Sequence, residues 1–144
     1  MNIIGYDVMQ IEEEFAKEVG LMKADLNTLL QSCDYVSIHV PLLESTHHLL
    51  DAEKMSTMKN TAKIINTSRG GVVDEDALYE AIKNGTLGGA ALDVFEQEPA
   101  TGNKLVELDN VILTPHIGAQ TKEAQSLAAN VIGEKIIQIL RGVI

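Results

Sequence analysis

Short apolar runs recur along the chain, and most of them end at Gly, Pro, Asp or Asn. Runs of this length, rich in Ile, Val and Ala and bounded by turn residues, are typical of buried β-strands. The run over residues 35–40 is the clearest, because it is rich in β-branched residues and stops at Pro41. The pattern predicts strands over residues 3–7, 20–23, 35–40, 62–66, 89–94 and 111–114.

Between these runs, apolar residues recur at helical spacing. Asp25 and Asp74 are expected N-caps, and the last helix carries an apolar stripe from Leu127 to Leu140. The pattern predicts helices over residues 11–19, 26–32, 51–58, 74–83 and 121–141. Strands that alternate with helices predict a single α/β domain over residues 1–144, with a parallel sheet covered on both faces.

Composition narrows the possible functions. The 144 residues include 11 Lys and Arg against 21 Asp and Glu, a formal charge of −10. Nucleic acid and an anionic membrane are therefore disfavoured as partners, because both bind clustered cations. No apolar run approaches the roughly 20 residues that span a bilayer, and no signal peptide is evident. Cys33 is the only cysteine, so an intramolecular disulfide is impossible and a cytoplasmic location is expected.

Polar residues at the strand ends are the candidate functional groups, since ligands of open α/β sheets bind there. Asp7 closes the first expected strand and could accept both hydroxyls of an adenosine ribose. A lone aspartate in this position is more often an N-cap or a solvated turn. Arg69 lies in a glycine-containing turn after the strand over 62–66 and offers a planar fork for a carboxylate. Without that context it would be a surface ion-pair residue.

Two further strand ends carry acids and a histidine. Residues 93–99 read Asp-Val-Phe-Glu-Gln-Glu-Pro, and such crowding of carboxylates can shift a pKa, although a solvated acidic loop fits equally well. His116 follows Pro115 in a stiff turn, and imidazole is the usual general acid–base near neutral pH. His39, His47 and His48 lack that setting. Neither zinc-ligand spacing nor a Gly-x-Ser-x-Gly elbow is present, so we expect no metal site and no serine hydrolase.

In chain order these motifs resemble one family, the NAD-dependent D-2-hydroxyacid dehydrogenases, and within it most closely the D-3-phosphoglycerate dehydrogenases. The resemblance spans nearly the whole chain, and its later motifs are long and specific. It is carried by Gly5-Tyr6-Asp7, His39-Val40-Pro41-Leu42, Ile65-Asn66-Thr67-Ser68-Arg69-Gly70-Gly71-Val72-Val73-Asp74, Ala91-Leu92-Asp93-Val94-Phe95-Glu96-Gln97-Glu98-Pro99 and Thr114-Pro115-His116-Ile117-Gly118-Ala119.

The resemblance implies an NAD-dependent oxidoreductase that acts on the CH–OH group of a D-2-hydroxy acid, with 3-phosphoglycerate, in serine biosynthesis, as the favoured substrate. Arg69 would hold the substrate carboxylate, His116 would transfer the hydroxyl proton, and Glu98 would orient and charge the imidazole. Asp7 would bind the adenosine ribose, and Asp93 would face the nicotinamide. The cofactor cleft would also be lined by His39, Val40, Pro41, Thr67, Ser68, Arg69, His116, Gly118 and Ala119.

The chain departs from the family pattern at its start. A complete member has a substrate domain, and then a Gly-x-Gly-x-x-Gly turn about 20 residues before the ribose aspartate, which here is residue 7. We therefore expect an incomplete Rossmann-like, doubly wound parallel sheet that lacks its first strand. Unpaired strand edges and the apolar stripe of the last helix predict a homodimer, or association with a chain that supplies the missing half. The alternative is a non-catalytic nucleotide-binding or association module derived from such an enzyme.

Overall fold

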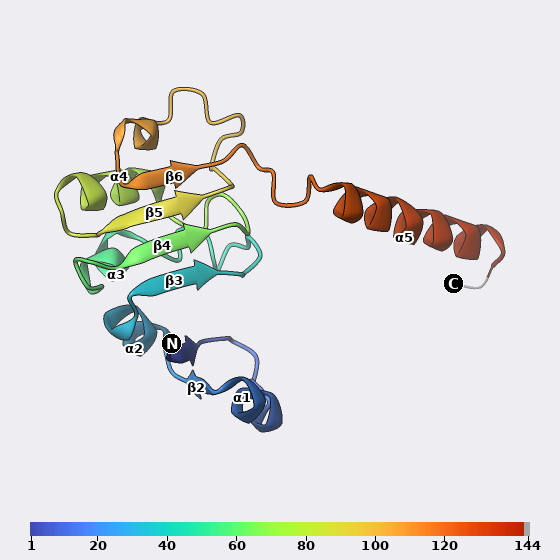
Figure 1. The fold of residues 1–144 in the computed structure, drawn as a ribbon, viewed down its shortest axis with the longest axis horizontal. Helices are drawn as coiled ribbons and strands as arrows, with labels where there is room; N and C mark the ends of the chain where they lie inside the picture. Colours follow the sequence, from blue (N-terminus) through green and yellow to red (C-terminus); the bar gives the residue numbers. More distant parts are fainter. Residues whose placement is uncertain (143–144) are drawn as a thin grey trace.

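The computed structural model describes residues 1–142, which form two parallel sheets (Figure 1). The larger sheet has the strand order β3-β4-β5-β6 and is preceded by α2. This arrangement confirms the α/β class and the parallel topology. The elements of this larger body are α2 (Leu26–Ser32), β3 (Tyr35–Ile38), α3 (Ala52–Ser56), β4 (Lys63–Asn66), α4 (Glu75–Lys83), β5 (Gly89–Leu92), the 3-10 helix η1 (Lys104–Glu107) and β6 (Val111–Leu113).

Only one face of the larger sheet is buried by the described residues. Alternate side chains of β3, β4 and β5, such as Val36, Ile64 and Leu92, pack into one apolar core with side chains of α2, α3 and α4. On the opposite face, Tyr35 is 64% exposed and Ile112 is 69% exposed. Residues 1–142 therefore cover one face of the sheet with helices, where the sequence predicted cover on both faces.

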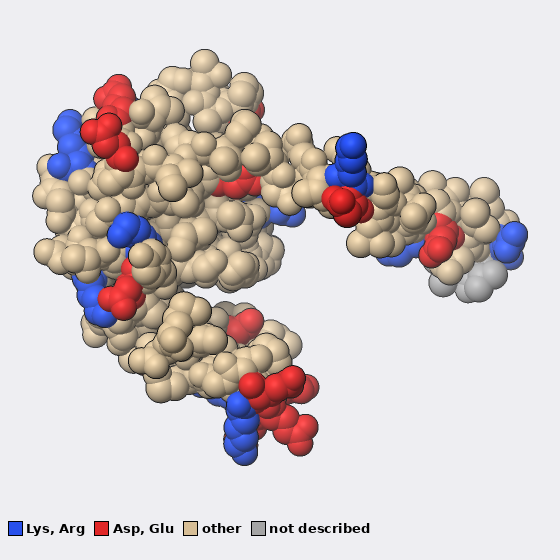
Figure 2. Space-filling view, in the orientation of Figure 1, with Lys and Arg blue, Asp and Glu red and all other residues tan. Residues whose placement is uncertain are grey.

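The smaller sheet stands at the N-terminus and consists of β1 (Ile3–Gly5) and β2 (Leu21–Lys23), joined by α1 (Glu13–Val19). Among the described residues β1 pairs with β2 and not with β3. β1 and β3 therefore each keep the unpaired edge that the sequence predicted, and they do not pair directly with each other. Figure 2 shows an open recess between this N-terminal unit and the larger body.

The last helix, α5 (Lys122–Leu140), leads away from the larger body (Figure 1). Its N-cap is Thr121, whose hydroxyl accepts the N–H of Ala124 at 3.1 Å. No residue of α5 is buried, and Leu127 and Ile132 are 65% and 58% exposed. The predicted apolar stripe thus lies uncovered in residues 1–142.

The elements agree with the predicted ones, but most are up to three residues shorter. The predicted N-caps are confirmed, because Asp25 accepts the N–H of Thr28 and Asp74 that of Ala77, each at 2.9 Å. β5, for example, ends before Asp93, whose side chain accepts hydrogen bonds from the turn after β6. The sequence pattern did not predict η1, which has only one turn.

Candidate active site

The carboxyl ends of β3 to β6 meet at one edge of the larger sheet, as the parallel register requires (Figure 1). Each strand is followed there by a predicted site segment: residues 39–41 after β3, 67–71 after β4, 93–99 after β5 and 114–119 after β6. The structure therefore brings four of the five sequence motifs to one edge. The fifth, which ends at Asp7, belongs to the separate β1–β2 sheet.

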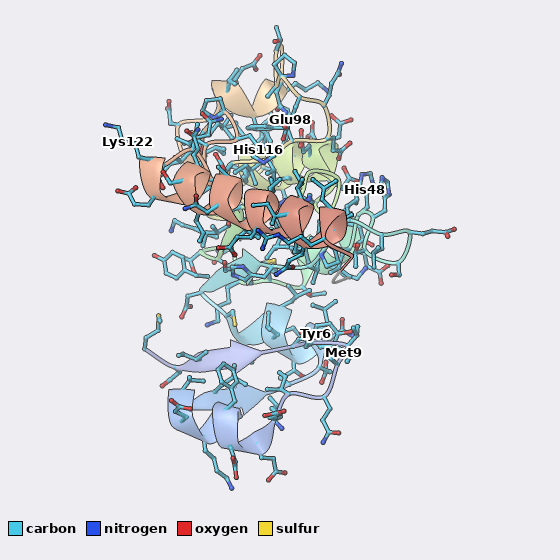
Figure 3. All side chains as sticks on the ribbon, turned by 90° about the vertical axis from the view of Figure 1, so that its right-hand side faces the viewer. Tyr6, Met9, His48, Glu98, His116 and Lys122 are labelled. Carbon is cyan, nitrogen blue, oxygen red and sulfur yellow. The ribbon has the colours of Figure 1, made fainter. Side chains whose placement is uncertain are left out.

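His116 and Glu98 form a hydrogen-bonded pair at this edge (Figure 3). Nδ1 of His116 lies 2.8 Å from Oε2 of Glu98, and Oε1 of Glu98 accepts the N–H of Phe95 at 3.1 Å. The hydrogen bond from His116, together with that from Phe95, lowers the pKa of Glu98. An ionised carboxylate at Nδ1 fixes the orientation of the imidazole, so Nε2 is the ring atom available for proton transfer.

Asp93 holds the turn that carries His116. The buried carboxylate accepts the hydroxyl of Thr114 at 2.5 Å and the N–H of Ile117 at 2.9 Å on Oδ1, and the N–H of Gly118 at 2.8 Å on Oδ2. Burial opposes ionisation, but these hydrogen bonds outweigh it and the pKa of Asp93 is lowered. Between the bonded residues, His116 has a left-handed backbone with a φ of 54°, which costs energy in a non-glycine residue and is held by the surrounding contacts. That Asp93 also faces the nicotinamide stays a prediction.

Asn66 and Gly70 shape the turn of Arg69. The buried amide of Asn66 donates to the carbonyl of Arg69 at 2.9 Å and accepts the N–H of Ser68 at 3.1 Å. Nη1 of Arg69 donates to the carbonyl of Ser68 at 2.6 Å, and the residue is exposed. A Cβ on Gly70 would lie 1.8 Å from the carbonyl oxygen of Phe95. Only glycine therefore lets the Arg69 turn pack directly on the acidic loop.

The predicted cofactor residues are divided between two places. Asp7, after β1, is exposed and accepts the N–H of Met9 at 2.8 Å, which is the local turn given above as its alternative. Figure 3 shows its neighbours Tyr6 and Met9 well separated from Glu98 and His116. Seven others lie at the edge of the larger sheet and are exposed or half-buried: His39, Val40, Pro41, Thr67, Ser68, Gly118 and Ala119.

These groups suit the two ends of a dinucleotide. The exposed Asp7 carboxylate still has acceptor capacity for a ribose diol, and the turns after β3, β4 and β6 offer polar groups at the sheet edge where nicotinamide would lie. The sequence contains no Gly-x-Gly-x-x-Gly turn for the pyrophosphate. The residues present therefore suit the adenosine ribose and the nicotinamide of the dinucleotide, but not its pyrophosphate.

Sequence reasoning missed two residues that contact the acidic loop, His48 and Glu75, and assigned no role to Glu96 within it. Oε1 of Glu96 lies 3.0 Å from Nε2 of His48 and accepts the N–H of Glu75 at 3.1 Å. These partners are 48 and 21 residues apart in the sequence, so no local pattern reveals them. The crowding of acids over residues 93–99 was the one available signal.

In the part of the chain that the structure describes, no group of three or more His, Cys, Asp or Glu side chains is arranged to hold a metal ion. None of the helices in residues 1–142 has the length and apolar character needed to cross a bilayer.

The chain has parallel strands with a histidine–glutamate pair at their carboxyl edge, and an aspartate follows a separate strand. These features define an α/β domain of the Rossmann-like, nucleotide-binding class. Residues 1–118 match the family model of the NAD-binding domain of the D-isomer specific 2-hydroxyacid dehydrogenases. The chain belongs to this family.

Similar proteins agree with this assignment. The chain is 49% identical over 143 residues to a D-3-phosphoglycerate dehydrogenase of Methanocaldococcus jannaschii, a match that covers 99% of this chain and 27% of the relative. It is 51% identical to a glyoxylate reductase of Thermofilum pendens, covering 99% of this chain and 42% of that protein. Among solved structures, D-lactate dehydrogenase from Aquifex aeolicus, complexed with NAD and lactic acid, superposes with a TM-score of 0.90 at 35% identity, over 99% of this chain and 47% of that one. The chain thus spans less than half the length of each of these three proteins.

Proposed function

We propose that this chain is the NAD-binding and catalytic part of an NAD-dependent oxidoreductase acting on the CH–OH group of a D-2-hydroxy acid. The observation that carries the proposal is the His116–Glu98 pair, which lies at the same sheet edge as the exposed Arg69. Membership of the family supports NAD as the cofactor and a small 2-hydroxy or 2-oxo acid as the substrate.

Each group has its own task in the proposed reaction. Because Nδ1 of His116 donates to Glu98, Nε2 takes the hydroxyl proton of the substrate during oxidation and returns it during reduction. Ionised Glu98 stabilises the imidazolium that forms. The guanidinium of Arg69 pairs with the substrate carboxylate and polarises the 2-oxo group. Bound NAD supplies the hydride acceptor.

We favour 3-phosphoglycerate as the substrate, which would place the protein in serine biosynthesis. The support is that several similar proteins, including the one from Methanocaldococcus jannaschii, are named D-3-phosphoglycerate dehydrogenase. Others that match over the same span are named glyoxylate reductase or hydroxypyruvate reductase. Glyoxylate and hydroxypyruvate are therefore the competing substrates to compare in an assay.

A titration with NAD, followed by NMR, tests the proposed function. We expect amide shifts at Asp7, at residues 39–40 and over residues 67–69 and 116–119, because these segments would line the cofactor cleft. Shifts confined to other segments, or none at millimolar NAD, would contradict the proposal and favour an association module without a nucleotide site.

Catalysis by the 144-residue chain alone is expected to be negligible, because it covers less than half of the relatives that bear dehydrogenase names. Enclosure of the substrate matters, since misplacing reacting groups by about 1 Å costs ~10²-fold in rate. Steady NADH formation from phosphoglycerate, abolished by His116→Ala, would overturn this expectation.

We also propose that the chain forms a two-fold homodimer, with association to a chain that places a strand between β1 and β3 as the alternative. The uncovered apolar stripe of α5 supports self-association. Light scattering should give about twice 15.6 kDa, and charged substitutions at Ile132 and Ile136 should lower that mass, whereas Glu134→Gln on the same helix should not. A monodisperse monomer at micromolar concentration would reject the homodimer.

A further inference from the structure

Glu75 and Glu96 form a reciprocal pair of hydrogen bonds between α4 and the acidic loop. Oε1 of Glu75 accepts the N–H of Glu96 at 2.6 Å, and Oε1 of Glu96 accepts the N–H of Glu75 at 3.1 Å. Each carboxylate thus binds the backbone of the other residue. The pair fixes the first turn of α4 against the loop segment that leads, two residues later, to Glu98.

Neighbouring groups hold both carboxylates in place. Oε2 of Glu75 accepts the amide of Asn103 at 2.6 Å. Oε1 of Glu96 lies 3.0 Å from Nε2 of His48, whose Nδ1 lies 3.7 Å from Oδ2 of Asp74. The loop is therefore bonded to the segment before α3 and to the first turn of α4, and the segment before η1 holds Glu75 in turn.

The two carboxylates of the pair are well hydrogen-bonded, but their negative charges repel each other. Burial raises the pKa of Glu75, with the nearby Glu96 charge acting in the same direction. Two facing carboxylates are a poor choice for stability alone, because an apolar contact of the same size would avoid the desolvation of a charge. The two carboxylates instead position the backbone, because a carboxylate that binds one particular N–H fixes the place of that backbone segment.

We propose that Glu75 and Glu96 are positioning residues, which hold the acidic loop so that Glu98 meets Nδ1 of His116. This role rests on the function proposed above, in which the Glu98–His116 pair transfers the substrate proton. The loop has two fixed points, namely the contact of Phe95 with Gly70 and the reciprocal pair. Both fixed points lie between the N–H of Phe95 and Glu98 along the chain, so a shift of the loop lengthens the bonds of Glu98.

The titration of Glu98 tests this role in the 144-residue chain itself, without substrate or cofactor. Its carboxyl carbon is followed by NMR against pH in the unchanged protein, in Glu75→Ala and in the control Asp76→Ala. Asp76 is an acid on the same turn of α4, and among residues 1–142 its one ion pair is the exposed one with Lys104 at 3.2 Å. In Glu75→Ala the pKa of Glu98 should rise toward its ordinary value of 4.5, and the Nδ1 resonance of His116 should move with it. In Asp76→Ala neither should change.

The sign of the shift separates positioning from simple charge removal. Deleting a nearby negative charge would by itself lower the pKa of Glu98, whereas losing the hydrogen bonds from His116 and Phe95 raises it. A purely structural role would lower the melting temperature of Glu75→Ala and leave the Glu98 titration unchanged.

A second variant, Glu96→Ala, acts on the other half of the pair and decides the matter where Glu75→Ala does not fold. An unchanged or lowered Glu98 pKa in the folded variants, or an equal rise in Asp76→Ala, would overturn the proposal. Failure of the NAD titration would contradict the proposed function and leave this result intact, so the two fail separately.

Discussion

At the carboxyl edge of the larger sheet, His116, Glu98 and Asp93 bind partners from distant parts of the chain, whereas among the described residues the carboxylate of Asp7, after β1, binds a single local one. His116, Glu98 and Asp93 are joined through contacts that reach 18 to 25 residues along the sequence. Asp7 binds an N–H only two residues away. The two predicted ends of the cofactor site thus differ in how much of their structure this chain provides.

The difference follows from where each site lies in the fold. The catalytic edge is formed by adjacent strands of one sheet with a continuous core beneath it, so its groups are ordered before any ligand arrives. β1 belongs to a two-stranded sheet with an open edge, and two strands alone give little stability. Changes at the first site should therefore alter the folded chain, and changes at the second should alter only binding.

Gly70→Ala should produce the largest effect. The added Cβ would lie 1.8 Å from the carbonyl oxygen of Phe95 and 2.2 Å from its carbonyl carbon, so the two loops must separate. We expect a loss of about 3 kcal/mol or more in the free energy of unfolding, measured with urea. Gly133→Ala is the control, because a Cβ there meets nothing within 4 Å. A loss below about 1 kcal/mol would show that the loops yield easily.

Asp93→Asn should weaken the turn that carries His116. The amide nitrogen of asparagine would face either the N–H of Gly118 or the N–H of Ile117, so at least one part-buried donor loses its acceptor. Leaving a fully buried donor unsatisfied costs about 1 to 3 kcal/mol, and we expect the lower part of that range here. Hydrogen exchange at Ile117 and Gly118 should accelerate by about tenfold or more, with the exposed Asp109→Asn as the control. Equal protection of these amides from exchange in both variants would contradict the role of Asp93 in holding the turn.

Much of this edge could be predicted from the sequence, because its signals are local. Asp25 and Asp74 cap helices through N–H groups three residues ahead, and strand runs end at the residues that later form the site. The partners of Glu75 and Glu96 come from different elements, and no periodicity encodes such a meeting. Likewise, the pattern does not reveal that α5 itself lies uncovered in residues 1–142, because its apolar residues would look the same on a packed helix.

Acid should destabilise the catalytic edge in a defined order. The folded pKa values of Asp93 and Glu98 lie below their ordinary values of 3.8 and 4.5, so the stability they contribute is present at neutral pH and is lost as pH falls through the lowered values. Glu75 has a raised pKa, so its protonation should first raise stability slightly. Urea midpoints should therefore increase a little on acidification and fall below about pH 4.5. Asp93→Asn should make the fall of the urea midpoint at low pH less steep. An unchanged fall would contradict the role of Asp93 in holding the turn.

The smallest effect is expected at Asp7, where only ligand affinity is at stake. If Asp7 binds the adenosine ribose, its negative charge repels the 2′-phosphate of NADP, so the chain should bind NAD weakly and NADP more weakly still. Asp7→Asn should narrow that difference by a few-fold, since an exposed charge pair is worth about 1 kcal/mol or less, and it should leave the urea midpoint unchanged. Asp34→Asn, an exposed acid that pairs with Lys59 in the larger body, is the matched control. Calorimetry that showed NADP bound more tightly than NAD would remove Asp7 from the cofactor site and leave it as the solvated turn that its bond to Met9 already forms.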